Sequence, residues 1–223
     1  MKFLILILIS FSLMATDTDP WEDSNRAIFE FNQVLDKNVL LPVAKIYKDN
    51  MPKKVQNRVR NFSANVSDFS TLGNELAQFE VLNSGNTLSR VLINSTVGLF
   101  GLFDVASGIG LHKSKEDFGQ TLAVWGVPEG NYMVLPVLGS SSVRGIIGAA
   151  ADGAQKTKLT KKVESTPKVA VEVIKSIDTR VQLLSITKLL KKSNDPYIAV
   201  RSSYLQKKKY DVYNGNLPED DEF

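Results

Sequence analysis

Apolar residues recur every three or four positions along most of this chain, and runs that alternate β-branched with polar residues are scarce. This spacing predicts helices rather than strands. Asp23 or Ser24 can cap a first helix that extends to about Leu41, where Pro42 is expected to end it. No fixed-period repeat stands out, so the sequence does not indicate a solenoid.

Five later helix starts carry a capping side chain or a proline in the first turn. They lie at Pro52, at Ser84, in the run 114–117 that approximates a capping box, at Thr166-Pro167 and at Asp195-Pro196. The helix after Pro167 is expected to be the longest. Its apolar stripe consists of Val169, Val173, Ile177, Val181 and Leu184. The last helix should extend to about Val212, and the whole pattern predicts an all-α fold.

The middle third of the chain differs in charge and in glycine content. Only Asp104 is charged within residues 93–111, and only Glu129 and Arg144 are charged within residues 118–151. A soluble core that packs closely at glycines would explain this block. Short glycine-broken helices embedded in one membrane leaflet are the other explanation. No stretch reaches the roughly 18 apolar residues that a spanning helix needs.

The first residues have the pattern of a secretory signal peptide. Met1-Lys2, an apolar stretch over residues 3–13 and small residues near Ala15 predict a signal at 1–15. As a helix the apolar stretch would span only about 16 Å of a hydrocarbon core of about 30 Å. An uncleaved interfacial anchor is the alternative. Residues 16–213 are expected to form one helical domain, followed by a disordered acidic tail over 214–223.

The amino-acid composition argues against most classes of catalytic or metal-binding site. The chain has no cysteine and a single histidine, His112, which argues against thiol catalysis, a transition-metal site or a Ser-His-Asp triad. The serine run 140–142 is interpreted as a helix cap rather than an anion-binding turn. Glu116 and Asp117 are interpreted as solvated first-turn charges rather than catalytic groups. A net charge of +3 is too small to indicate nucleic acid, and we expect no enzyme, cofactor or metal.

A series of short motifs runs along the chain in a fixed order. It begins with the run 19–32, Asp-Pro-Trp-Glu-Asp-Ser-Asn-Arg-Ala-Ile-Phe-Glu-Phe-Asn. Later members are Pro42-Val43-Ala44, Asn61-Phe62-Ser63-Ala64-Asn65, Phe103-Asp104-Val105-Ala106, Phe118-Gly119-Gln120-Thr121-Leu122, Trp125-Gly126-Val127, Leu135-Pro136, Ala151-Asp152-Gly153 and Asp195-Pro196-Tyr197-Ile198. In order and spacing they resemble the MlaA/VacJ family, lipid-trafficking proteins of the Gram-negative outer membrane, over residues 19–215.

The resemblance implies a fold and a function. Members of that family form a flattened helical ring, embedded in the inner leaflet of the outer membrane, with a hairpin beside an amphipathic channel. Mislocalised phospholipid leaves the outer leaflet through the channel and passes to a periplasmic phospholipid carrier protein, which maintains lipid asymmetry. An outer-membrane porin trimer holds the ring. The alternative function is a soluble periplasmic structural or adaptor protein that conducts no lipid.

This chain differs from the family pattern at one point. Family members are usually lipid-anchored through a cysteine just after the signal, and this chain contains no cysteine. A lipid anchor of that kind is therefore not expected. The protein would instead be attached to the membrane by its own surface or by an uncleaved leader.

The resemblance also suggests site residues. Residues 125–139 match the family's hairpin beside the channel; this segment starts at Trp125, and Gly126 and Gly130 are expected to form its turns. The apolar wall for acyl chains would consist of Val134, Leu135, Val137 and Leu138. The candidates for contact with the phosphate headgroup are Arg144 and Lys156. An ordinary surface turn is the alternative for the hairpin segment.

Overall fold

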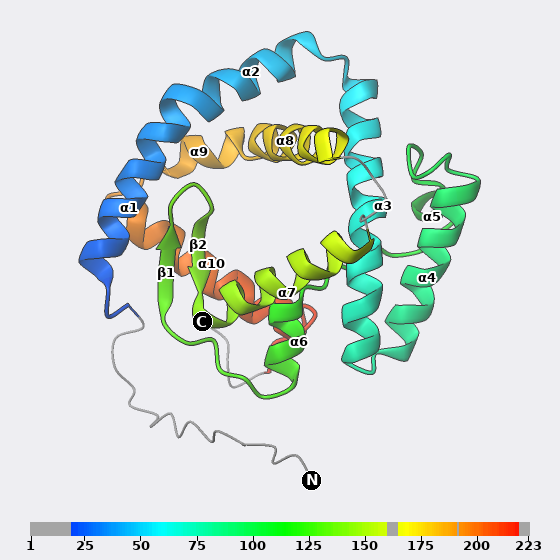
Figure 1. The fold of residues 1–223 in the computed structure, drawn as a ribbon. Coiled ribbons are helices and arrows are strands. Elements are labelled where there is room, and N and C mark those ends of the chain that lie inside the picture. The colour runs from blue at the N-terminus through cyan, green and yellow to red at the C-terminus, as the bar shows by residue number, and fades with distance from the viewer. Residues whose placement is uncertain (1–18, 160–164, 191, 219–223) are drawn as a thin grey trace.

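The computed structural model describes residues 19–159, 165–190 and 192–218, and the fold is a ring of helices with one small hairpin (Figure 1). The elements in chain order are α1 (Glu22–Leu35), the π-helical η1 (Asp36–Leu40), α2 (Leu41–Asn50), α3 (Lys53–Ala77), α4 (Val81–Thr96), α5 (Val105–Gly108), α6 (Phe118–Val124), β1 (Tyr132–Leu135), β2 (Gly139–Ser142), α7 (Val143–Leu159), α8 (Ser165–Gln182), α9 (Leu184–Leu190) and α10 (Pro196–Val212). The expected mostly helical fold is confirmed. The expected signal peptide lies outside the described residues.

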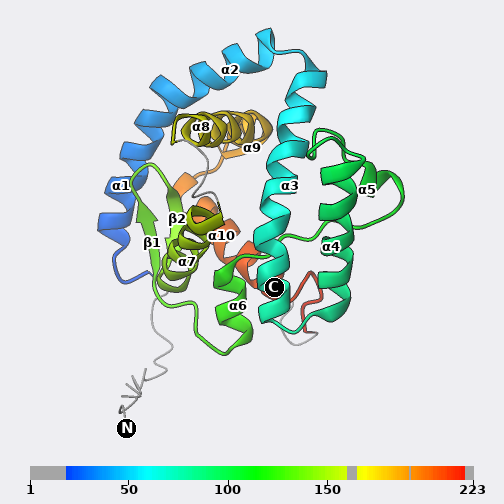
Figure 2. The same cartoon turned by 45° about the vertical axis from the view of Figure 1, so that its right-hand side comes forward.

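The helices follow one another around the ring. In Figure 1, α1, η1 and α2 form an arc at the upper left, α3 descends on the right, and α6 and α7 lie along the lower side. The hairpin and α10 lead back to α1, while α8 and α9 lie inside the arc. Figure 2 keeps this order and shows α4 and α5 against the outer side of α3. The hairpin therefore lies on the inner side of α1 and close to α9 and α10.

The first helix does not end at Pro42, contrary to the expectation. The chain continues from α1 through η1 into α2, with Pro42 in the first turn of α2. In η1 the turn is wider than in an α-helix, and the Leu41 N–H donates to the Asp36 carbonyl five residues earlier. This wider turn accommodates a proline, which lacks an N–H and crowds the preceding turn.

The other predicted helix starts are confirmed at three prolines, with Pro167 in the first turn of α8, and differ at Ser84 and Ser114. Pro52 directly precedes α3, and Asp195 caps α10 by accepting from the Tyr197 and Ile198 N–H groups. Ser84 does not cap α4, because it lies one turn inside the helix and donates to the Glu80 carbonyl. The capping box at α6 consists of Asp117 and Gln120 rather than the expected run starting at Ser114.

The expectation for the longest helix was wrong. The longest helix is α3 with 25 residues, whereas α8 has 18. The predicted stripe is also not a buried face, since Val169 and Val173 are exposed and Leu184 belongs to α9. Residues 214–218 of the predicted disordered tail are described, and Asn214 donates to Glu80 at 2.8 Å. The rest of that tail lies outside the described residues.

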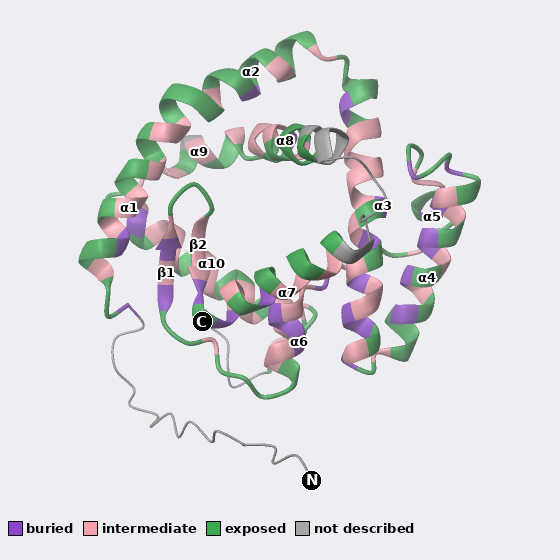
Figure 3. Cartoon of the chain, in the orientation of Figure 1, coloured by how far each residue is buried: buried purple, intermediate pink, exposed green. Residues whose placement is uncertain are grey.

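Polar side chains fill much of the interior, and large apolar side chains cover much of the surface. Figure 3 colours the ribbon by burial and shows buried positions on α3, α4 and α6. Buried polar residues on α3, α4 and α6 are Asn65, Asp68, Thr71, Asn74, Glu75, Thr87, Arg90, Asn94, Gln120 and Thr121. Apolar residues that are more than half exposed include Phe79, Val81, Leu82, Val97, Phe100, Ile109 and Leu138. This distribution is the reverse of that in ordinary soluble domains. Over the described ranges, no helix is both long and apolar enough to cross a membrane.

Candidate functional site

The hairpin forms one wall of the site. β1 pairs antiparallel with β2, with Tyr132 opposite Ser142 and Leu135 opposite Gly139, so the turn consists of residues 136–138. The predicted segment 125–139 therefore overlaps the hairpin only in its second half. Gly126 and Gly130 lie in the loop before β1 and do not form the hairpin turn, which is a correction. The reason is that Val137 itself adopts a positive φ of 68°, and the turn closes there.

Two asparagines of α1 bind the free edge of β1. The Asn25 side-chain oxygen accepts from the Val134 N–H at 2.8 Å, and its Nδ2 donates to the Tyr132 carbonyl at 3.2 Å. Seven residues later, Asn32 Oδ1 accepts from the Val137 N–H at 2.7 Å. Its Nδ2 donates to the Leu135 carbonyl at 2.9 Å. The side chains thus replace a third strand, which stabilises a two-stranded hairpin that would be marginal alone.

A small aromatic cluster supports the base of the hairpin. Tyr132 is fully buried, and its ring meets that of Tyr197 edge-on with centroids 6.3 Å apart. The Phe29 ring also meets that of Tyr197 edge-on, with centroids 5.6 Å apart. The Tyr197 hydroxyl donates to Asp19, and burial together with this bond raises the pKa of Tyr197. The cluster therefore joins α1, β1 and α10 at a fixed point below the turn.

A cavity of about 460 Å³ lies between α1, the hairpin, α9 and α10. Its apolar lining consists of Phe29, Leu40, Val134, Val137, Leu183, Ile186, Leu190, Pro196 and Val200. Two of the four predicted wall residues, Val134 and Val137, line it, whereas Leu135 and Leu138 do not. Strand alternation explains this division at Val134 and Leu135, since successive side chains point to opposite faces.

The cavity also has a charged side. Asp36 and Arg180 both line it and form a two-point ion pair, with Nη2 to Oδ2 at 2.8 Å. This hydrogen bonding holds the pKa of the Arg180 guanidinium above its ordinary value, so the arginine stays charged. Asn32, Ser140 and Thr187 add polar atoms to the lining. A mostly apolar cavity with a few converging polar groups suits an amphiphile.

The loop before the hairpin has its own geometry. Gly126 and Gly130 have positive φ values of 88° and 71°, where a side chain would be strained. A Cβ added at Gly130 would lie 2.9 Å from the Val143 Cβ, whereas the space at Gly126 is open. Trp125 ends α6, is 55% exposed and donates through Nε1 to the Ala77 carbonyl at 3.1 Å. These residues position the loop but do not line the cavity.

The two headgroup candidates are engaged within the protein. Arg144 is buried, pairs with Glu129 and donates to the Val127 carbonyl at 2.9 Å, so it fastens the loop before β1. Lys156 pairs with Glu172 at 3.0 Å and thereby joins α7 to α8. Neither residue lines the cavity. The serine run includes the expected cap, because Ser142 Oγ accepts from the Gly145 N–H at 2.9 Å at the start of α7.

A buried carboxyl cluster between α3 and α6 was missed from the sequence. Glu116 is 6% exposed and accepts from Gln78 and Gln120, so its interpretation as a solvated charge was wrong. Burial raises the pKa of Glu116 to about 7. Glu75 is fully buried, and burial raises its pKa as well. The available signal was the helical spacing of polar residues, such as Asp68, Thr71 and Glu75 on α3.

Comparison with known proteins adds family evidence to this geometry. The sequence profile of the MlaA lipoprotein family matches residues 17–211. An uncharacterised protein of Rickettsia typhi is 36% identical over 186 residues, which cover 83% of this chain and 74% of that protein. The intermembrane phospholipid transport system lipoprotein MlaA of Escherichia coli K12 is 32% identical over 204 residues, 90% of this chain and 80% of that protein.

A solved structure agrees with the fold. It is described as the structural basis for maintenance of bacterial outer membrane lipid asymmetry, and it matches with a TM-score of 0.77 at 32% identity. The match covers 87% of this chain and 98% of the other. A relative from Haemophilus influenzae, also an intermembrane phospholipid transport system lipoprotein MlaA, is 31% identical over 92% of this chain and 83% of its own length. The chain belongs to the MlaA lipoprotein family.

Proposed function

We propose that this protein is the outer-membrane component of an intermembrane phospholipid transport system. It lies in the inner leaflet, accepts phospholipid that has strayed into the outer leaflet and releases it to a periplasmic phospholipid carrier protein. No bond is made or broken in this process. A porin trimer holds the ring in the membrane.

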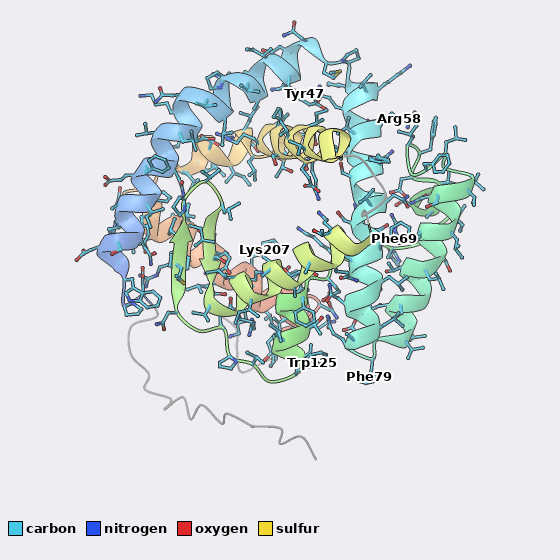
Figure 4. The ribbon with its side chains drawn as sticks, viewed as in Figure 1. Tyr47, Arg58, Phe69, Phe79, Trp125 and Lys207 are labelled. Atoms are coloured by element: carbon cyan, nitrogen blue, oxygen red, sulfur yellow. The ribbon has the colours of Figure 1, made fainter. Side chains whose placement is uncertain are left out.

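The observation that carries the proposal is the reversed distribution of polar and apolar side chains around a mostly apolar cavity. Phe79 and Leu82 at the turn between α3 and α4 are 87% and 90% exposed. In water such surface would be costly, at about 25 cal/mol per Å² of apolar area, whereas in lipid it costs nothing. Figure 4 places Phe79 and Trp125 at the same end of the molecule.

The cavity supplies the second requirement, a place for acyl chains. Val137 and Ile186 face it from the hairpin and from α9, and the Arg180–Asp36 ion pair supplies polar atoms to its lining. The same apolar surface argues against the alternative of a soluble adaptor. We therefore expect the purified protein to require detergent to remain dispersed.

The test is complementation of a deletion strain with Val137→Asp, which places a charge in the cavity. Aspartate tolerates a positive φ better than valine does, so a loss of function would reflect the charge and not the backbone. The matched control is Ser176→Asp, which adds the same charge at an exposed polar position on α8 outside the cavity. We expect phospholipid to accumulate in the outer leaflet with Val137→Asp only. Equal lipid asymmetry in both strains would contradict the proposal.

A further inference from the structure

The short helix α9 has a cavity on each of its two faces. Leu183, Ile186 and Leu190 line the apolar cavity described above. A second cavity, of about 880 Å³, lies on the other face. Its lining consists of Leu41, Lys45, Lys48, Asp49, Leu184, Ser185, Thr187, Leu189 and Lys192. Thr187 lines both cavities, so they adjoin at the middle of α9.

The second cavity is rimmed by positive charge. Lys45 and Lys48 come from α2, Lys192 follows α9, and Asp49 is the acidic residue among the lining residues. Within the part of the chain that the structure describes, none of the three lysines forms an ion pair. Among the described residues, the cavity thus combines lysine ammonium groups that have no carboxylate partner with apolar leucine side chains. This combination suits an anionic ligand that also has an apolar part.

Ion pairs anchor the chain before and after α9. Before it, Arg180 on α8 binds Asp36 on η1. After it, Asp195 binds Arg26 on α1 at 2.8 Å. Between these two ion pairs the helix has empty space on both faces.

We propose that these adjoining cavities form one phospholipid site, with the phosphate bound by Lys45, Lys48 and Lys192 and the acyl chains in the apolar cavity. The glycerol part of the lipid passes Thr187. The inference rests on the proposed function and names the substrate site for it. The occupant is a membrane phospholipid rather than free phosphate, because the lysines alone would suit both but the apolar cavity suits only the lipid.

The test uses the full chain in detergent micelles with two photoactivatable probes that carry identical diazirine acyl chains. One probe is phosphatidylglycerol, and the other is diacylglycerol, which lacks the phosphate. We expect phosphatidylglycerol to label peptides of the hairpin and of α9. Charge reversal by Lys45→Glu with Lys48→Glu should lower this labelling at least about tenfold, because charge-assisted hydrogen bonds are lost and repulsion is added. Labelling by diacylglycerol should not change.

The matched control is Lys53→Glu with Lys54→Glu, which makes the same charge change at exposed positions outside both cavities. The milder pair Lys45→Gln with Lys48→Gln should give an intermediate loss, and circular dichroism should be unchanged for every variant. Labelling of the Lys45 and Lys48 variants at the wild-type level, labels at peptides elsewhere, or displacement of the probe by inorganic phosphate alone would overturn the site and leave the proposed function standing. A wild-type protein that takes up no phospholipid would overturn both.

Discussion

Asn25 and Asn32 lie seven residues apart, two turns of α1, and this spacing brings both amides to the edge of β1. An amide that accepts from one backbone N–H and donates to one carbonyl reproduces the bonding of a neighbouring strand. The two residues therefore fix the hairpin against the helix and place Val134 and Val137 at the cavity. Neither role could be assigned from residue type alone.

Asn32→Ala should destabilise the protein by about 1–3 kcal/mol, because two backbone groups of the hairpin lose their partners. The turn residue Val137 should become more mobile, and hydrogen exchange at its amide should rise. Asn38→Ala is the control on η1, since Asn38 is exposed and donates to the Val34 carbonyl one turn earlier. Its effect should stay within about 0.5 kcal/mol. Equal effects of the two changes would show that Asn32 does not restrain the turn.

Gly130→Val should disturb the loop before β1 more than Gly126→Val. Both changes place a β-branched residue at positive φ, which costs about 1–3 kcal/mol. Only the change at Gly130 adds a collision with Val143. We expect outer-leaflet phospholipid to increase in both strains, while far-ultraviolet circular dichroism stays near wild type. Gly85→Ala is the control, since this helical glycine has open space and should not lose stability. Wild-type asymmetry in both loop variants would make the loop a passive connection.

At the scale of elements, the helices α3, α4 and α6 are joined by polar side chains instead of an apolar core. Thr121 donates to Asn74 at 3.0 Å, and Gln78 donates to both Thr121 and Glu116. A buried polar network of this kind specifies a unique packing of the helices when its polar groups are hydrogen-bonded. A protonated Glu116 costs less to bury than a charged one, which explains why its pKa is raised.

Stability should consequently fall as pH rises from about 4.5 to about 7. Over this window the unfolded Glu116 has lost its proton and the folded residue retains it, so the folded state binds more protons. A shift from 4.5 to about 7 corresponds to about 3 kcal/mol. Glu75 is shifted in the same direction and adds to the effect.

The measurement is the thermal midpoint of the protein in detergent between pH 5 and pH 8, for wild type and Glu116→Gln. The amide mimics the protonated acid and should flatten the pH dependence. His112→Gln is the control, because this exposed residue lies outside the carboxyl cluster. An unchanged slope in Glu116→Gln would assign the pH dependence to other groups.

At the scale of the whole molecule, the ring presents apolar side chains outward and retains polar groups within. The turn between α3 and α4 carries Phe79, Val81 and Leu82, all more than three-quarters exposed. Under the proposed function, surface side chains of this kind make the contact with the membrane.

Phe79→Asp combined with Leu82→Asp should weaken membrane association without changing the fold. Each aspartate costs up to about 3 kcal/mol when it enters lipid, and each lost apolar side chain removes about 1.5–3 kcal/mol of transfer free energy. Flotation with liposomes measures the effect. Asn83→Asp is the control, an exposed neighbour on the same helix that adds a charge without removing apolar area. Equal flotation of the double variant and wild type would place the membrane contact elsewhere.

The sequence by itself determined the helical class, three of the helix starts and the family. Those features depend on local chemistry: the proline before α3, the Asp195 cap and the order of short motifs act within a few residues. It also located the low-charge region that contains the hairpin. It could not show that Pro42 is absorbed by a π-helical turn, because that depends on how the whole arc packs.

Only the tertiary structure decided which residues face the cavity and which bind other groups of the protein. Arg144 was a reasonable phosphate ligand by residue type, but Glu129 and the Val127 carbonyl already occupy its guanidinium. The sequence did not indicate that Arg180, Lys45 and Lys48 line cavities beside α9, since contacts across more than 100 residues cannot be inferred from spacing. Pairing and burial arise where distant segments meet, and they decide whether a charge is available to a ligand.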